Sequence, residues 1–188
     1  MYRQFGKRAL DILGAAIALT ILSPLLLALA IGVRLSSPGP SLFQQARVGR
    51  YGQTFRICKF RSMPADTRDA ASDQLGEVHL RPFGKFLRRS NLDELPQLYN
   101  ILRGDMSFIG PRPSLPSQTD LLELRKQNGA LECRPGLTGL AQVNSFDGMS
   151  AKVKSRFDGQ YATNISLWND IVVAFKTLGY LAKPPPTY

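Results

Sequence analysis

Residues 12–33 read ILGAAIALTILSPLLLALAIGV, a run of 22 residues without a formal charge. The hydrocarbon core of a bilayer needs about 20 helical residues, so this run is long enough to cross a membrane. It is too long for the apolar part of a cleaved signal peptide, and no small-residue cleavage site follows it. Ser23 and Pro24 stand at its midpoint, where Pro24 removes the backbone donor that would bond the Thr20 carbonyl. We therefore predict a membrane helix that is interrupted at Ser23-Pro24.

Basic residues flank this helix on both sides, at Arg3, Lys7 and Arg8 before it and at Arg34, Arg47 and Arg50 after it. Because Lys and Arg mark the cytoplasmic side of a membrane helix, both ends are expected on that side. Each half then has about 11 residues, or roughly 16 Å of helix, close to the depth of one leaflet. We favour a re-entrant helix whose Ser23 and Thr20 hydroxyls bond carbonyls at the break, with a kinked single span as the alternative. Asp11 is expected near the interface, paired with Arg8 or Lys7.

Composition and charge limit the number of domains and the classes of function that fit this chain. The chain has 188 residues, enough for one ordinary domain, and a net charge of +10. Residues 1–90 carry 14 Lys and Arg against 5 Asp and Glu, so the first half should attract polyanions or anionic lipid. Aromatic residues are sparse among the basic runs, which disfavours binding of single-stranded nucleic acid. Cys58 and Cys133 have no metal or redox spacing, and His79, the only histidine, has no local support for a catalytic triad.

Beyond Pro40 the sequence is typical of a folded, helix-rich domain. Residues 41–48 and 54–63 alternate around the turn-like GRYG and predict a β-hairpin. Helices are expected at 81–90, about 95–103 and near 117–127, and two more between about 150 and 182. Residues 133–144 are interpreted as a loop leading into a brief strand. The last helix has a broad apolar face, which we expect to pack in the core rather than to face a membrane: Leu167, Trp168, Ile171, Val172, Phe175 and Leu178.

Residues 90–99, SNLDELPQLY, place two adjacent carboxylates ahead of a proline. In one interpretation Ser90 is the N-cap of a capping box and Asp93 bonds back from the third helical position. In the other the helix begins near Leu95, with Pro96 at its favoured first position. Both put Asp93 and Glu94 at a helix N-terminus, which favours their ionised forms. Such a carboxylate is a structural anchor or a nucleophile, and position alone favours the anchor.

Cations beside turn-forming residues surround this acidic pair in the sequence. They lie in KFRSM, FLRRS, GPRP and CRPG, at Lys59, Arg61, Arg88, Arg89, Arg112 and Arg134. Such groups bind phosphates by charge-assisted hydrogen bonds, and arginine does so in a bidentate manner. The chain has no Gly-rich P-loop, so nucleotide phosphates would be held by arginines and a metal. Mg²⁺ needs only one or two protein carboxylates, shares phosphate oxygens and neutralises the charge that a carboxylate must overcome to attack phosphorus.

Four stretches together resemble a known family: KRALDILGAAIALTILSPLLLALA, KFRSM, RRSNLDELPQLYNILRGDMSFIGPRP and RPGLTGLAQVN. In this order they resemble the small monotopic phosphoglycosyl transferases, a group of bacterial sugar transferases. The resemblance implies transfer of a sugar 1-phosphate from a UDP-sugar to undecaprenyl phosphate with release of UMP. This would be the first membrane step of surface-glycan assembly, at the cytoplasmic face of the inner membrane. It also implies a helix-rich α+β fold, with a re-entrant helix over 1–36 and a compact cytosolic domain over 37–188 that carries amphipathic interfacial helices and a small hairpin.

The resemblance also assigns roles to residues. Asp93 would be the nucleophile and the Mg²⁺ ligand, Glu94 its acidic partner, and turnover would be ping-pong through a covalent aspartyl-phosphosugar. The expected substrate contacts are Lys59, Arg61, Arg88, Arg112, Arg134, Gln142 and Asp158. A Gly-Arg pair that is common after QVN is absent here, and the loop at 144–150 is a candidate for sugar selectivity.

Partners implied in the same way are a UDP-sugar, undecaprenyl phosphate and anionic membrane lipid, but no nucleic acid; monomer or homodimer stays open. Two other functions compete with the transferase. A membrane-associated phosphohydrolase would deliver water to the same aspartyl-phosphate, and a basic binding module would have no catalytic step.

Overall fold

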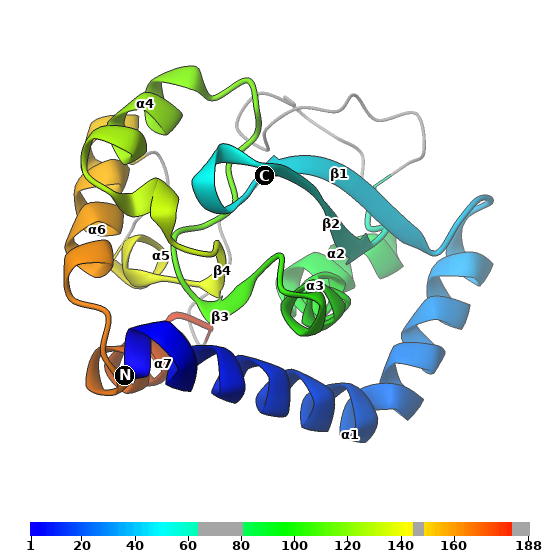
Figure 1. The fold of residues 1–188 in the computed structure, drawn as a ribbon. Coiled ribbons are helices and arrows are strands. Elements are labelled where there is room, and N and C mark those ends of the chain that lie inside the picture. The colour runs from blue at the N-terminus through cyan, green and yellow to red at the C-terminus, as the bar shows by residue number, and fades with distance from the viewer. Residues whose placement is uncertain (64–80, 145–148, 182–188) are drawn as a thin grey trace.

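The computed structural model describes residues 1–63, 81–144 and 149–181 and shows helices arranged around two small sheets (Figure 1). The predicted helix-rich α+β class is confirmed. In chain order the elements are η1 (Tyr2–Gly6), α1 (Lys7–Ser36), β1 (Leu42–Val48), η2 (Arg50–Gly52), β2 (Thr54–Phe60), α2 (Pro82–Arg89), η4 (Leu92–Glu94), α3 (Gln97–Arg103), β3 (Ser107–Ile109), α4 (Thr119–Gln127), η5 (Ala130–Glu132), β4 (Gly136–Thr138), α5 (Leu140–Asn144), α6 (Ala151–Thr163) and α7 (Leu167–Leu181).

The hairpin forms where the alternating pattern predicts it. β1 and β2 pair antiparallel, from Leu42 opposite Phe60 to Val48 opposite Thr54. The turn passes through η2, where Tyr51 has a φ of 57° and Gly52 a φ of 78°. A left-handed residue is strained unless it is glycine, so Gly52 makes this tight connection easier. The hairpin prediction is confirmed.

A second, parallel sheet was not predicted. β3 pairs with β4 in the register Ser107 to Gly136 and Ile109 to Thr138. A Cβ atom at Gly110 would lie 2.3 Å from the Arg134 carbonyl oxygen, so the close approach of these segments needs glycine. The brief strand expected within residues 133–144 is present as β4, after a short loop, but residues 140–144 form helix α5. Strands of three residues are too short to show alternation in a sequence.

Helix α1 is bent and stays continuously helical from Lys7 to Ser36, with Pro24 inside it. Figure 1 shows its first half along the lower edge of the molecule and its second half turning away along the side. The Ser23 hydroxyl donates to the Thr20 carbonyl at 2.8 Å, in place of the amide that Pro24 lacks. The predicted role of Ser23 is therefore confirmed, while the Thr20 hydroxyl bonds the Ala16 carbonyl, one turn earlier.

The two halves of α1 pack against different hydrophobic clusters. Ala15 in the first half lies in the cluster that also contains Ile57, Leu98, Ile101 and Met106. Leu29 and Val33 in the second half pack with Phe60 and Leu87. Glycines let aromatic rings approach closely, since a Cβ at Gly14 would lie 2.9 Å from the Phe108 ring and one at Gly32 2.5 Å from the Phe83 ring. The bend thus lets one helix follow the surface of the domain.

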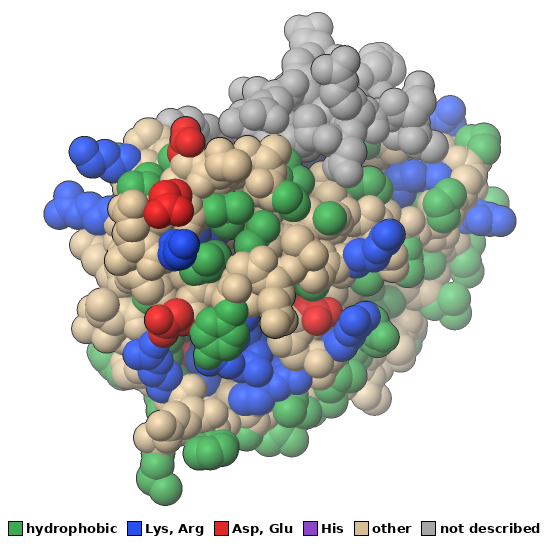
Figure 2. All heavy atoms as spheres, turned by 45° about the horizontal axis from the view of Figure 1, so that its top comes forward, with side chains coloured by type: hydrophobic (Ala, Val, Ile, Leu, Met, Phe, Trp, Pro, Cys, Tyr) green, Lys and Arg blue, Asp and Glu red, His purple; other side chains and the backbone are tan. Residues whose placement is uncertain are grey.

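The outer face of α1 is apolar and exposed. The helical run Tyr2–Ser36 is long and apolar enough to cross a membrane by length and composition, and only 11% of its most apolar window is buried. Green side chains follow the lower and right-hand margins of the face in Figure 2. Exposed apolar residues of α1 are Leu10, Ile12, Leu13, Ile17, Ile21, Leu25, Leu27, Ile31 and Leu35.

The broad apolar face of α7 is also exposed, so the expectation that it packs in the core is wrong. Trp168 is 71% exposed, Phe175 69% and Leu178 64%. The buried residues of α7 are Asp170 and Val173, on the opposite face, and Val173 packs with Ile109 and Tyr161. Amphipathic periodicity shows that a helix has an apolar face but does not show what covers it.

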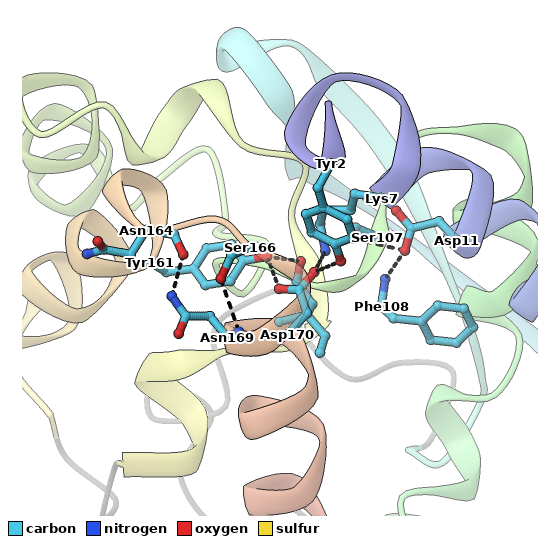
Figure 3. A network of polar contacts seen from close by, with 11 residues as sticks. Tyr2, Lys7, Asp11, Ser107, Phe108, Tyr161, Asn164, Ser166, Asn169 and Asp170 are labelled. Carbon is cyan, nitrogen blue, oxygen red and sulfur yellow. Dashed lines mark hydrogen bonds and ion pairs between the residues drawn. The ribbon is translucent and has the colours of Figure 1, made fainter.

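A buried carboxylate joins the start of the chain to α7 (Figure 3). Asp170 accepts hydrogen bonds from the hydroxyls of Tyr2 and Tyr161 and from the Lys7 ammonium group, at 2.6 Å for Lys7. Asp11 instead accepts from the Ser107 hydroxyl and the Phe108 amide, at 3.0 and 3.1 Å. This corrects the expected pairing of Asp11 with Arg8 or Lys7. These contacts fix the first turns of α1 on β3, α6 and α7.

Candidate active site

The acidic pair lies in a short 3-10 turn between α2 and α3. The Ser90 hydroxyl donates to the Phe86 carbonyl at 2.8 Å and ends α2, so the capping-box interpretation is wrong. Asn91 then adopts the left-handed conformation with a φ of 54°, which asparagine tolerates better than most residues. Pro96 directly precedes α3 as its N-cap. The interpretation that put Pro96 at the helix start is therefore correct to within one residue.

Glu94 is held by two cations from different parts of the chain. Its Oε1 atom lies 2.6 Å from the Lys59 ammonium on β2 and 2.7 Å from the Arg112 guanidinium in the loop after β3. Burial raises the pKa of Glu94, but Arg112 and Lys59 lower it more, so the net shift is well below the usual range. Glu94 is thus a fixed negative charge that orients Lys59 and Arg112.

Asn100, buried on α3, sets the position of β2 beside this turn. Its side-chain amide donates to the Arg56 carbonyl at 2.8 Å and accepts from the Cys58 amide at 2.9 Å. The side chain therefore pairs with the strand much as a neighbouring backbone would, and Lys59 follows directly. Sequence reasoning missed Asn100, because a single polar residue in a helix gives no signal of this kind.

Asp93 differs from its neighbour in having no direct partner in the described part of the chain. It is 9% exposed, and none of the residues that the structure describes donates a hydrogen bond to its carboxylate. Burial and the nearby Glu94 raise its pKa, Lys59, Arg88 and Arg112 oppose this, and the net result is a pKa of about 6. At neutral pH the carboxylate is therefore ionised but poorly stabilised, which makes it a better nucleophile than an ion-paired carboxylate.

The loop that carries Arg112 is fixed on two sides. The Val48 amide donates to the Ser114 carbonyl at 2.9 Å, and the Arg47 guanidinium donates to the Pro113 carbonyl at 3.2 Å. From the other side the Arg125 guanidinium donates to the Arg112 carbonyl at 2.9 Å.

Arg125 is itself held by a buried carboxylate. It pairs with Asp158 at 2.7 Å, and the two side chains are 4% and 1% exposed. Asp158 was expected to contact substrate, but in the structure it is buried against Arg125. It therefore supports the position of Arg112 indirectly, through Arg125. Sequence reasoning did not single out Arg125.

The other predicted substrate contacts divide into two groups. Arg88 on α2 is close enough to Asp93 to influence its pKa. Arg61 is buried and donates to the Ser37 carbonyl and hydroxyl, which ties the end of β2 to the end of α1. The Gln142 amide donates to the Leu137 carbonyl, and the Arg134 guanidinium to the Gly104 carbonyl after α3. The structure thus brings Lys59, Arg88 and Arg112 to the acidic pair and places Arg134 at the other end of α3.

The carboxylates present suit a magnesium ion that is shared with substrate. Over residues 1–63, 81–144 and 149–181 there is no group of three or more His, Cys, Asp or Glu residues that would hold a metal alone. Glu94 is engaged by two cations, whereas Asp93 has its carboxylate available. Mg²⁺ accepts this arrangement, since it takes one or two protein carboxylates together with phosphate oxygens and water. The predicted loop at 144–150 and His79 lie wholly or largely outside the described residues.

Comparison with known proteins gives a consistent result over almost the whole chain. A family described as bacterial sugar transferase matches residues 2–184. A UDP-glucose:undecaprenyl-phosphate glucose-1-phosphate transferase from Caulobacter vibrioides is 40% identical over 97% of this chain and 72% of its own length. A UDP-N-acetylgalactosamine-undecaprenyl-phosphate N-acetylgalactosaminephosphotransferase from Aeromonas hydrophila is 42% identical over 93% of this chain and 43% of its own. A UDP-glucose:undecaprenyl-phosphate glucose-1-phosphate transferase from Escherichia coli is 39% identical over 92% of this chain and 39% of its own length. The chain thus spans less than half the length of two of these three relatives.

Proposed function

The chain belongs to the bacterial sugar transferase family, and from this premise we propose that it transfers a sugar 1-phosphate from a UDP-sugar to undecaprenyl phosphate. The names of its relatives specify this reaction for several sugars, so the sugar itself is left open. The observation that carries the proposal is the contrast within the acidic pair. Glu94 is bound by Lys59 and Arg112, while Asp93 is buried beside them and accepts no hydrogen bond from any residue that the structure describes.

In the first step an oxygen of the Asp93 carboxylate attacks the β-phosphorus of the UDP-sugar. The bond from that phosphorus to the bridging oxygen breaks, and UMP leaves with the electron pair. A phosphosugar is then bonded to Asp93 as a mixed anhydride. Lys59 and Arg112, held by Glu94, and Arg88 bind the phosphate oxygens and offset the repulsion between carboxylate and diphosphate.

In the second step an oxygen of undecaprenyl phosphate attacks the same phosphorus. The bond to Asp93 breaks, the carboxylate is restored, and the lipid leaves as a diphosphate-linked sugar. Two steps at one carboxylate let the water-soluble product UMP leave before the lipid phosphate arrives from the membrane side. The same cations serve both steps, because each moves negative charge across the same phosphoryl group.

Magnesium is the metal that suits this site, and Asp93 would be the protein ligand that holds it together with the substrate's phosphate groups. When bound, it would neutralise charge on the diphosphate and on the departing UMP. The protein supplies the remaining positive charge through Lys59, Arg88 and Arg112.

We propose that α1 enters the membrane as a re-entrant helix and that the reaction occurs at the cytoplasmic face of the inner membrane. The bend of α1 and its exposed apolar face support this placement. The exposed face of α7 adds Trp168, Phe175 and Leu178 to the apolar surface. Helices of this kind lie in the interface, with their apolar side among the acyl chains.

The test is release of UMP by the purified full chain with Mg²⁺, a panel of UDP-sugars and undecaprenyl phosphate. We expect repeated turnover with at least one donor only when the lipid is present. Repeated UMP release that is independent of lipid would indicate the phosphohydrolase instead. No release with any donor would favour the binding module.

Removal of divalent metal is expected to abolish turnover and leave the fold intact. The described residues contain no metal-binding cluster that could stabilise the fold, so circular dichroism should not change with EDTA. Activity should return on addition of excess Mg²⁺. Full activity in EDTA would contradict the assignment of a metal to Asp93.

A further inference from the structure

A cavity that the proposed reaction does not use lies at the N-terminal end of α1. Its walls carry five cations, at Arg3, Lys7, Arg8, Arg50 and Arg134. Four residues of the network in Figure 3 also line it, so the cavity adjoins the contacts that fix the start of α1: Lys7, Asp11, Ser107 and Tyr161. In Figure 2 several Lys and Arg side chains lie close together low in the view.

This cavity and the acidic pair lie at opposite ends of α3. The Arg8 guanidinium donates to the carbonyls of Ile101 and Leu102, at 2.6 and 2.9 Å, and Arg134 donates to the Gly104 carbonyl at 3.0 Å. These carbonyls end α3, whereas Asp93 precedes its first turn. A helix of 7 residues is about 10 Å long, so one phosphate cannot contact both places.

Among the described residues, Arg50 and Arg134 each have both terminal guanidinium nitrogens left over. Lys7 is paired with Asp170, and Arg8 is engaged by the two α3 carbonyls. Arg50 and Arg134 each use only Nε for a hydrogen bond, to the carbonyls of Glu132 and Gly104. Within the described part of the chain, the terminal nitrogens of these two guanidinium groups have no hydrogen-bond or ion-pair partner.

The carboxylates of the cavity do not satisfy these donors. Asp11 is occupied by the Ser107 hydroxyl and the Phe108 amide. Glu132 is exposed and lies 3.9 Å from Arg3. Burial and the neighbouring charges of Arg50 and Arg8 lower the pKa of Arg134 more than Asp11 raises it, as expected where cations outnumber the nearby anions.

The size of the cavity limits what can bind. Its volume is about 50 Å³, which is room for a few water molecules. Sites for drug-sized ligands measure roughly 300 Å³ or more. The cavity therefore takes one small anionic group, such as a phosphate, and does not enclose a whole nucleotide or sugar. Two arginines with free terminal nitrogens suit a phosphate, which guanidinium groups bind through paired hydrogen bonds.

The surroundings favour a phosphate that is attached to a lipid. Phe5 is 77% exposed and Leu10 50%, and both lie on the same end of the chain as Arg3, Lys7 and Arg8. An apolar surface next to a basic cluster is the arrangement that holds a helix at an anionic membrane surface. We propose that this cavity binds the phosphate group of an anionic phospholipid and so fixes the start of α1 at the membrane interface. The proposal goes beyond the transfer reaction and does not require Asp93.

The test is native mass spectrometry of the full chain in detergent with added phosphatidylglycerol. We expect one retained lipid per chain, displaced by excess inorganic phosphate, and weaker retention of zwitterionic phosphatidylcholine. The double variant Arg50→Gln with Arg134→Gln should weaken binding by about tenfold or more, since it removes charge-assisted hydrogen bonds. The matched control is Lys126→Gln with Arg156→Gln, which removes the same charge from exposed positions. It should bind normally.

Two further variants and one further binding measurement distinguish loss of the site from misfolding and from binding elsewhere. Arg50→Gln alone changes an exposed side chain, so it should fold, as judged by circular dichroism, and should still weaken binding. Arg112→Gln should leave phosphatidylglycerol binding unchanged, whatever happens to sugar transfer. Equal loss in Arg112→Gln, or normal binding in folded Arg50→Gln with Arg134→Gln, would overturn the proposal. Binding of inorganic phosphate without binding of the lipid would overturn the assignment to a phospholipid.

Discussion

Replacing Asp93 with asparagine is expected to abolish sugar-phosphate transfer and, at pH 7, to make the protein more stable. Loss of a nucleophile costs several orders of magnitude in turnover. The gain in stability follows from the pKa of about 6 for Asp93, raised from 3.8 chiefly by burial. A carboxyl with a raised pKa in the folded state binds its proton more tightly there, so ionising it destabilises the fold.

The pH range of this effect follows from the same two pKa values. At about pH 3 and below, the carboxyl of Asp93 is largely protonated in both the folded and the unfolded chain, and there is almost no penalty. The penalty grows between about pH 3 and pH 6 and is complete near pH 7. A shift of about two pKa units corresponds to at most about 3 kcal/mol in the free energy of unfolding.

Denaturation of Asp93→Asn and wild type in the same detergent, at pH 7 and at pH 4, measures this difference. The matched control is Asp120→Asn, at an exposed position on α4, which should change stability by less than about 0.5 kcal/mol. A stability loss in Asp93→Asn at pH 7 would mean that Asp93 is the structural anchor that its position alone suggested. Near-normal turnover would exclude it as the nucleophile.

Asp158→Asn is expected to destabilise the protein by about 3–5 kcal/mol and to lower turnover of the molecules that remain folded. Arg125 would keep its charge in a place where its side chain is 4% exposed, and a buried charge without its partner is costly. The donor to the Arg112 carbonyl would lose its support, so Arg112 would be held less firmly against Glu94. Chemical denaturation and turnover per folded molecule measure the two effects.

The double variant Arg125→Met with Asp158→Leu separates stability from function. It removes both buried charges and should recover most of the lost stability, because apolar replacements of buried ion pairs are often neutral or better. Turnover should stay low, since methionine cannot donate to the Arg112 carbonyl. Normal turnover in this variant would show that the pair stabilises the fold without positioning Arg112.

Local patterns predicted the parts of the fold that depend on neighbouring residues. Three features could be predicted from residues close together in the sequence: the apolar run at 12–33, the alternation of β1 and β2, and the position of Pro96. The structure has a helix, a hairpin and a helix start at these places. A brief strand was expected where β4 lies, but its parallel pairing with β3 was not, because the pairing joins residues about 30 positions apart. The exposed face of α7 was misjudged, since what covers a helix depends on the rest of the chain.

The site was predicted in part for the same reason. Asp93 and Glu94 are adjacent, so their proximity is visible in the sequence, but their contrasting environments are not. Glu94 meets Lys59 and Arg112 from 35 and 18 residues away. Arg134 stands beside a turn as Arg112 does, yet it bonds the far end of α3. Residue type indicates phosphate binding, and only the fold decides which cations share a site.

The central claim is that a bond forms between Asp93 and phosphorus during turnover. Its most direct test is mass spectrometry of the full chain, quenched after incubation with Mg²⁺ and an active UDP-sugar in the absence of undecaprenyl phosphate. We predict an added mass of one phosphosugar, located on the peptide that contains Asp93, and its disappearance when undecaprenyl phosphate is added. No adduct with a donor that supports turnover, or an adduct on another residue, would contradict the account.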